Sequence, residues 1–175
     1  MLRVATPADE AAVDALMKAS AAVLFPRFYD ERQSASAVEH VAHVDPALLE
    51  DGTYFVLESE GELVGCGGWS RRGKLYTGSG DAAGDDRLLD PASEPARVRA
   101  MFVRADWTRR GLGRRILEAC EAAAKAEGFT QLSLVATLAG LPLYRAYGFV
   151  ELEWLEVVMP DGVAIPGVAM ERNIT

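Results

Sequence analysis

The feature that most constrains this 175-residue chain is an apolar strand that runs directly into an arginine- and glycine-rich turn and then into an amphipathic helix. The strand is predicted over residues 97–104 and the helix over 110–127, where apolar residues return every three or four positions. The first turn of a helix has backbone N–H groups without partners, and the helix dipole favours negative charge there. The junction therefore predicts an anion-binding site at the start of the helix.

Two glycines and three arginines suit this turn to a diphosphate. Gly111 and Gly113 have no side chains, so phosphate oxygens can approach the backbone closely. Arg109, Arg110 and Arg114 add positive charge. Gly-x-Gly alone is a weak motif, and a purely structural turn is the other interpretation. The segment is not a P-loop, since no Gly-Lys-Ser/Thr follows, and it has no third glycine for a dinucleotide fingerprint.

Charge is unevenly spread along the chain. The sequence has 18 Lys and Arg residues against 26 Asp and Glu, a net charge of −8, which argues against nucleic acid as a partner. Residues 97–115 nevertheless contain seven arginines and a single acid. Such a cationic island indicates a site for one anionic ligand, although an arginine-rich helix face in contact with water is the alternative.

Other features favour a cytoplasmic protein that has no membrane contact. No apolar run approaches the roughly 20 residues that a membrane span needs, and the first residues show no signal-peptide pattern. The only cysteines, Cys66 and Cys120, have no metal-binding spacing and form no disulfide framework. We therefore expect no bound metal and a reducing compartment.

The remaining pattern predicts one domain over residues 1–175 with a mixed α/β sheet. In strand 97–104, simple alternation predicts that Val98, Ala100 and Phe102 share one face. A glycine- and proline-rich loop covers residues 73–96, a length that is usually functional or mobile. A first helix is expected from Pro7 to a break at residues 24–30. Further helices are expected at 36–43, 110–127 and 138–147. Strands are expected at 2–5, 53–58, 62–69, 97–104, 131–136, 149–159 and 163–170.

A second motif, Leu-Pro-Leu-Tyr-Arg-Ala-Tyr-Gly-Phe at residues 141–149, follows the turn downstream. With both motifs, the segment 98–151 resembles the GNAT (GCN5-related) N-acetyltransferases. The phosphate signature of that family is Gln/Arg-x-x-Gly-x-Gly/Ala, and residues 108–113 here read Thr-Arg-Arg-Gly-Leu-Gly. The first position departs from the signature, and Leu138-Ala139-Gly140 stands where the family often has an asparagine.

The resemblance implies a mixed, mostly antiparallel sheet with two splayed central strands, 97–104 and 131–136, and flanking helices. Acetyl-CoA would bind as a cosubstrate between these strands. The strand residues Met101, Phe102 and Val103 would hold its pantetheine arm. Its pyrophosphate would lie on six consecutive residues of the turn: Arg109, Arg110, Gly111, Leu112, Gly113 and Arg114.

The resemblance also assigns a catalytic residue. Tyr144 stands where the family commonly has the tyrosine that protonates the departing thiolate, and a phenol within reach of sulfur can do this. A buried aromatic that only packs is the alternative interpretation, and we assign the neighbouring Tyr147 to packing. Neither cysteine falls in a matching place, so direct transfer in a ternary complex is expected, with the N–H of Val103 polarising the thioester carbonyl.

The acceptor is expected to be a primary amine of a small molecule or a peptide. Phe28 and Tyr29, in the break between the first two helices, are candidates for the acceptor pocket, with ordinary loop packing as the alternative. The acidic residues Asp81, Asp85 and Asp86 would favour a cationic acceptor, although a mobile loop in contact with water is the favoured interpretation of these acids.

The base that deprotonates the amine is not evident from the sequence. A chain of water molecules is the default. His40 and His43 are three residues apart and titrate in a useful pH range, but surface or core histidines are far commoner than catalytic ones. No third ligand accompanies them, which argues against a metal site.

Two alternatives to acetyl transfer stay open. One is a non-catalytic acyl-CoA-binding regulatory module, and the other is transfer of a longer acyl group. The sequence also leaves a homodimer open, in which the two final strands pair or swap between subunits.

Overall fold

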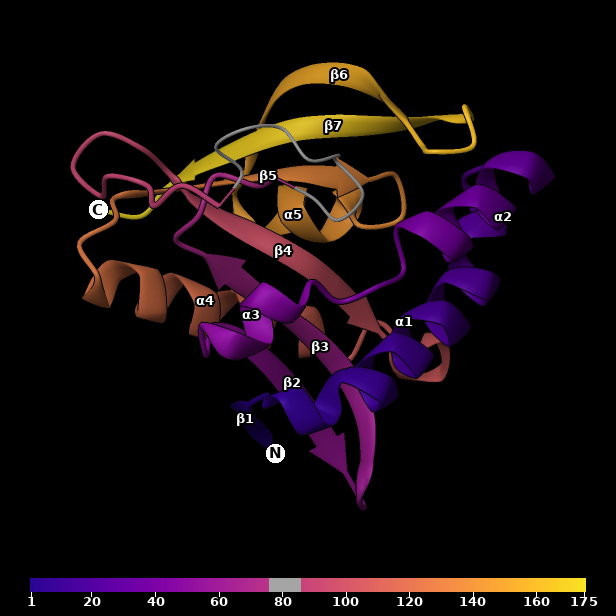
Figure 1. Cartoon of the computed structure of the whole chain (residues 1–175), viewed down its shortest axis with the longest axis horizontal. Coiled ribbons are helices and arrows are strands. Elements are labelled where there is room, and N and C mark those ends of the chain that lie inside the picture. Colours follow the sequence, from indigo (N-terminus) through magenta and orange to yellow (C-terminus); the bar gives the residue numbers. More distant parts are fainter. Residues whose placement is uncertain (76–85) are drawn as a thin grey trace.

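Seven strands form one mixed sheet in the part of the chain that the computed structural model describes, residues 1–75 and 86–175 (Figure 1). The sheet order is β1-β2-β3-β4-β5-β7-β6, and of the neighbouring pairs only β4 and β5 run parallel. This confirms the predicted mixed, mostly antiparallel sheet. The strands are β1 (Leu2–Val4), β2 (Tyr54–Ser59), β3 (Glu62–Ser70), β4 (Ala96–Val103), β5 (Gln131–Thr137), β6 (Val150–Val158) and β7 (Ala164–Asn173).

Helices cover both faces of the sheet, and each face has its own buried apolar cluster. On one face α1 (Glu10–Leu24), the short 3-10 helix η2 (Phe25–Arg27), α2 (Glu31–His40) and α3 (Pro46–Glu50) pack against the sheet. On the other face α4 (Leu112–Ala126) and α5 (Leu141–Tyr147) do so. Two further 3-10 turns, η1 (Pro7–Asp9) and η3 (Ala105–Trp107), precede α1 and α4.

The parallel strands β4 and β5 pair over only two residues and then separate. Ala96 pairs with Leu132 and Arg97 with Ser133. Beyond this point β4 stays paired with β3 up to Val103, and β5 stays paired with β7 up to Thr137. The centre of the sheet is therefore divided into two halves that part toward the carboxyl ends of these strands.

A bulge in β4 changes which side chains share a face. The register against β3 shifts between Cys66 and Gly68, and Ala100 adopts a φ of 50°. Val98 packs with the α4 cluster, whereas Ala100 and Phe102 pack with the α1 cluster. The predicted common face for these three residues is therefore wrong, because one extra residue in a strand reverses the alternation beyond it.

Helix starts also differ from the predicted ones, for reasons of capping. α2 begins at Glu31 instead of residue 36, since Asp30 caps it. The Asp30 carboxylate accepts from the N–H of Gln33 at 2.7 Å, and the Gln33 side chain accepts from the N–H of Asp30 at 3.1 Å. This reciprocal capping box stabilises a first turn that the polar sequence hides.

The helix of the phosphate turn begins two residues later than predicted. Arg109 and Gly111 have φ angles of 61° and 80°, in the left-handed region, so α4 begins at Leu112. Residues 138–140 likewise form a turn, and α5 begins at Leu141.

No helix in the described residues is long and apolar enough to cross a membrane. At the far edge of the sheet, β6 exposes four apolar side chains, Val150, Leu152, Trp154 and Val158. The pairing of the two final strands across a dimer stays a prediction.

Candidate active site

A cavity of about 710 Å³ lies where β4 and β5 part. Both strands, the end of α1 with η2, the first turn of α4 and the start of α5 contribute to its lining. Its size lies within the range of pockets that hold organic ligands. The end formed by the first turn of α4 and the end formed by α1 and η2 differ in chemistry.

The turn before α4 forms one end of the cavity. Arg109, Gly111, Leu112, Gly113 and Arg114 all line it. The first helical hydrogen bond of α4 runs from the N–H of Arg115 to the carbonyl of Gly111. Within the described chain, the N–H groups of residues 112–114 have no acceptor, so three amides and the helix dipole face one ligand site. We call this turn, residues 109–114, the phosphate end.

Glycine is favoured at the two glycine positions of the phosphate end for different structural reasons. A Cβ at Gly111 would meet nothing within 4 Å, and its positive φ is what favours glycine there. A Cβ at Gly113 would lie 2.6 Å from Cδ2 of Leu143, so the missing side chain allows α4 and α5 to pack closely.

The three arginines of the phosphate end have different surroundings. The guanidinium of Arg109 makes no ion pair with any described residue. Arg114 lies 3.3 Å from the Glu118 carboxylate and its guanidinium lies over the Tyr147 ring. Arg110 does not line the cavity, because its guanidinium stacks on the Trp107 ring, 4.5 Å from the centroid.

The predicted strand residues Met101, Phe102 and Val103 all line the cavity. The N–H of Arg104 donates to the carbonyl of Val64 on β3, at 2.9 Å. Because N–H groups alternate along a regular antiparallel pair, that of Val103 points away from β3, into the gap beside β5. The carbonyl of Val103 accepts from the Ser20 hydroxyl of α1, at 2.6 Å.

Tyr144 lies on α5 with its side chain facing the cavity. The residue is 7% exposed, and its ring contacts Phe149 edge to face. Its hydroxyl makes no hydrogen bond to the described residues and is not among their fully buried polar atoms. Burial raises the pKa of the phenol above its usual value, so Tyr144 is a protonated donor at neutral pH.

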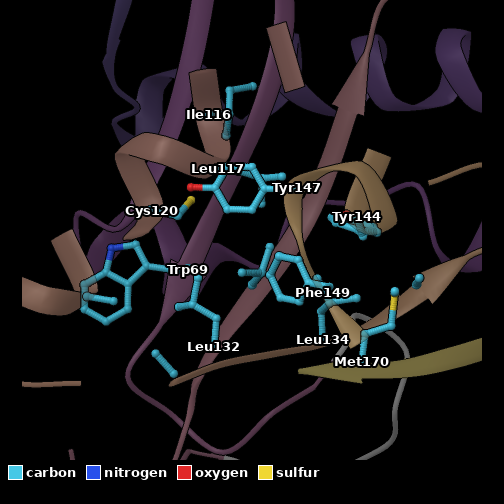
Figure 2. Close-up of a cluster of buried hydrophobic side chains, with 14 of the residues drawn as sticks. Trp69, Ile116, Leu117, Cys120, Leu132, Leu134, Tyr144, Tyr147, Phe149 and Met170 are labelled. Atoms are coloured by element: carbon cyan, nitrogen blue, oxygen red, sulfur yellow. The ribbon is translucent and has the colours of Figure 1, made fainter. Parts of the chain in front are cut away.

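Tyr147 is placed quite differently on the same helix. Its ring points toward α4, away from Tyr144 (Figure 2). Its hydroxyl donates to the Glu121 carboxylate at 3.3 Å, and the guanidinium of Arg172 lies over its ring. Burial raises its pKa to about 12. Tyr147 does not line the cavity, so the structure separates the two phenols that the sequence places in one motif.

The two aromatic candidates for the acceptor pocket also separate. Phe28 is 44% exposed and lines the cavity. Tyr29 is buried and lies outside the lining. Its hydroxyl accepts from the N–H of Leu138 at 2.8 Å and donates to the carbonyl of Pro166 at 3.0 Å. Tyr29 thus joins the end of β5 to β7 and holds the segment that presents Phe28.

The described lining contains no Asp, Glu or His. His40 lies 3.6 Å from Asp161, and His43 contacts Lys18 and the carbonyl of Glu39, all outside the cavity. Asp86 is exposed and does not line it, and residues 81 and 85 lie outside the described chain. Within residues 1–75 and 86–175, no cluster of His, Cys, Asp and Glu side chains could hold a metal ion.

Two polar residues of the lining, Ser20 and Arg27, were not identified from the sequence. Ser20 is a polar residue at a position of the apolar stripe of α1, and this exception to the pattern is a signal that could have found it. Arg27 sits within the aromatic break between Phe25 and Phe28, and no local pattern marks it as a cavity residue.

A family model described as an acetyltransferase (GNAT) domain matches residues 50–151 of the chain. This match covers β2 to the start of β6, including the phosphate end and α5. A comparison with curated proteins found no match.

Many solved structures share the fold. A GCN5-related N-acetyltransferase from Rhodopseudomonas palustris has a TM-score of 0.75 at 20% identity, over 99% of this chain and 94% of the other. The PaiA N-acetyltransferase from Thermoplasma acidophilum, solved with coenzyme A, has a TM-score of 0.68 at 13% identity over 99% and 98%. The acetyltransferase YncA from Salmonella typhimurium, solved with acetyl-CoA, has a TM-score of 0.63 at 18% identity over 100% and 94%.

Proposed function

The chain belongs to the GNAT family of acetyltransferases, and we propose that it moves an acetyl group from acetyl-CoA to a primary amine by direct transfer in a ternary complex. The observation that carries the proposal is one cavity with unpaired helix amides at its phosphate end and a protonated phenol, Tyr144, on its wall. The acetyl-CoA complexes among the structural neighbours support the choice of donor.

The phosphate end fits a diphosphate. The free amides of residues 112–114 and the unpaired Arg109 would bind the pyrophosphate, and Arg114 would add charge while keeping its contact with Glu118. Arg110 would act indirectly, since its stacking on Trp107 shapes the turn.

The free edge of β4 fits an extended pantetheine arm. The arm would pair with Met101 and Val103, which have no partner on β5 because the strands have parted. Phe102 would contribute by packing, since its backbone faces β3. The hydroxyl of Ser20 donates to the carbonyl of Val103, and this bond anchors the end of β4 to α1.

The chemistry then needs three events. The amine nitrogen attacks the thioester carbonyl carbon, whose oxygen accepts from the N–H of Val103. The carbon–sulfur bond breaks, and Tyr144 gives its proton to the departing sulfur. The new amide loses the extra proton from nitrogen to water, and Tyr144 regains a proton from solvent.

Deprotonation of the amine uses no protein base in this proposal. The described lining contains no Asp, Glu or His. The amine therefore reacts from the neutral fraction present in solution, and water is the proton acceptor that we propose.

A pair of matched variants tests the catalytic assignment. We expect Tyr144→Phe to lower kcat by roughly 100-fold, because it removes the general acid, while acetyl-CoA affinity changes less than twofold. Tyr147→Phe removes the same atom from the same helix but outside the cavity, and it should keep more than half of kcat. Coenzyme A thiol release measures both. Equal rates for the two variants would remove Tyr144 from its role.

Thiol release and thermal shift separate the proposed function from two rival functions. Tight acetyl-CoA binding without thiol release for any amine would favour a regulatory acyl-CoA-binding module. A larger thermal shift with succinyl-CoA or long-chain acyl-CoA than with acetyl-CoA would favour a longer acyl group. We also propose a cytoplasmic location, in keeping with two buried free cysteines, Cys66 and Cys120.

A further inference from the structure

We propose that the acceptor is an apolar amine that carries a carboxylate, as an apolar amino acid does, and that Arg27 binds this carboxylate. The inference rests on the acetyl-transfer function proposed above and names its substrate class. It follows from where Arg27 lies, from what surrounds it, and from the charges of the described lining.

Arg27 is held on a firmly anchored segment. It ends η2, and both Phe25 and Phe28 beside it line the cavity. The buried Phe25 ring lies 6.2 Å from the Phe102 ring of β4. Tyr29 binds the end of β5 and β7 through its hydroxyl. The segment is therefore fixed to both walls of the opening, and Arg27 is presented between them.

The guanidinium of Arg27 is available to a ligand. It has no hydrogen bond or ion pair with any residue in the described parts of the chain. In contrast, Arg97 on β4 donates to the Ser133 hydroxyl at 2.8 Å, and Arg104 after β4 pairs with Asp106 at 2.6 Å. An unpaired arginine at the wall of a cavity is a binding group for a planar anion, because its N–H fork matches a carboxylate.

Arg27 reaches the cavity from the face opposite to the phosphate end. Its neighbour Phe25 belongs to the buried cluster of α1 and α2, whereas Leu112 at the start of α4 belongs to the cluster of α4 and α5. The sheet lies between these clusters. Of the cations in the described lining, Arg27 is the one that does not come from the phosphate end. This places it on the side left for the acceptor once the pyrophosphate is bound.

The rest of this side is apolar. Besides Phe28, it includes Leu24 of α1, Val41 after α2 and Leu75. The described lining has no carboxylate to pair with a second ammonium group, so a polyamine would enter without a partner. An apolar body with one carboxylate satisfies both the apolar wall and the guanidinium. The cationic acceptor expected from the acidic loop stays a prediction, since Asp81 and Asp85 lie outside the described residues.

The experiment compares acceptors that differ only in the carboxylate. The pairs are phenylalanine against 2-phenylethylamine and leucine against isoamylamine, with spermidine as the polycation. Coenzyme A thiol release gives kcat/KM for each. We expect the wild-type protein to prefer the amino acid of each pair by roughly tenfold or more, the value of one charged hydrogen-bonded contact.

Three variants assign the preference to Arg27. Arg27→Met should abolish it by raising the KM for the amino acid, with the KM for acetyl-CoA unchanged. Arg27→Lys should keep part of it, since lysine keeps the charge without the fork. Arg32→Met is the control: Arg32 is also exposed and outside any described ion pair, but it lies on α2 away from the lining, and its loss should change nothing. Thermal melts verify that the variants fold.

The outcomes separate this inference from the function on which it rests. Preference for the decarboxylated amine or for spermidine, with active acetyl transfer, overturns the substrate class alone. A raised KM for acetyl-CoA in Arg27→Met, with the acceptor KM unchanged, assigns Arg27 to the donor and also overturns the inference. Bound acetyl-CoA with no thiol release for any acceptor overturns the proposed function and the inference together.

Discussion

The two ends of the cavity are built in different ways. The phosphate end is one continuous turn, residues 109–114, which follows directly from β4. The acceptor side combines α1, η2, residue 41, residue 75 and β4, which are far apart in the sequence. The first offers backbone groups that any helix start provides, and the second depends on side chains brought together only by the fold. In the function proposed above, donor binding would thus be encoded locally and acceptor choice by tertiary structure.

The largest expected effect is the pH dependence of acetyl transfer. It depends on two groups that need opposite protonation states, the phenol of Tyr144 and the acceptor amine. Burial raises the pKa of Tyr144, so this phenol, the general acid that we propose, stays protonated as pH rises through neutrality. The amine must be neutral, so its reactive fraction rises about tenfold for each pH unit below its own pKa. We expect kcat/KM for the acceptor to rise from pH 6 to 9 without a falling limb, while the Kd for acetyl-CoA changes much less.

Initial rates of thiol release across this range, at saturating acetyl-CoA, provide the measurement. The charged groups of the described lining are all arginines, Arg27, Arg109 and Arg114. A falling limb between pH 7 and 9 that disappears in Tyr144→Phe would show that the phenol is deprotonated in this range and would contradict the assignment.

The contrast between the two ends explains what the sequence could predict. The phosphate end follows from a local motif, because a strand–turn–helix junction needs only neighbouring residues. The splayed strands and the choice of Tyr144 rest on the resemblance to the GNAT family. The bulge at Ala100 and the place of Arg27 at the cavity could not be predicted, since they depend on the register of β3 and on helix packing. Ser20 is marked in the sequence as a polar exception in the apolar stripe of α1, but its bond to Val103 depends on the same packing. Tyr29 shows the same limit: its two hydrogen-bond partners, Leu138 and Pro166, lie more than 100 residues away.

An intermediate effect is expected at the phosphate end, where two adjacent arginines have different surroundings. Arg109 lines the cavity, and Arg110 stacks on Trp107. We expect Arg109→Gln to weaken acetyl-CoA binding about five- to tenfold, the loss of one partly exposed charged contact. Arg110→Gln removes the same charge and should weaken it less than twofold. Calorimetry of acetyl-CoA binding measures both values.

The same calorimetry at two salt concentrations separates direct contact from general attraction. The difference between the two variants should persist when added salt screens the long-range field. Equal weakening by both substitutions, lost at high salt, would mean that the phosphate end acts only through its summed charge.

The smallest catalytic effect is expected at Tyr29, on the acceptor side. Tyr29→Phe keeps the ring against Phe25 but removes the hydroxyl that joins Leu138 to Pro166. Leaving these two partly buried backbone groups without this partner should cost about 1–2 kcal/mol of unfolding free energy, or a Tm lower by about 2–4 °C for each kcal/mol. The KM for the acceptor should change less than twofold, because Tyr29 lies outside the cavity.

Phe28→Ala is the matched change: its exposed ring contributes little to stability, and its loss should raise the acceptor KM. If Tyr29→Phe instead raised the acceptor KM with an unchanged Tm, Tyr29 would belong to the substrate pocket, and the division between anchor and wall drawn from its hydrogen bonds would be wrong.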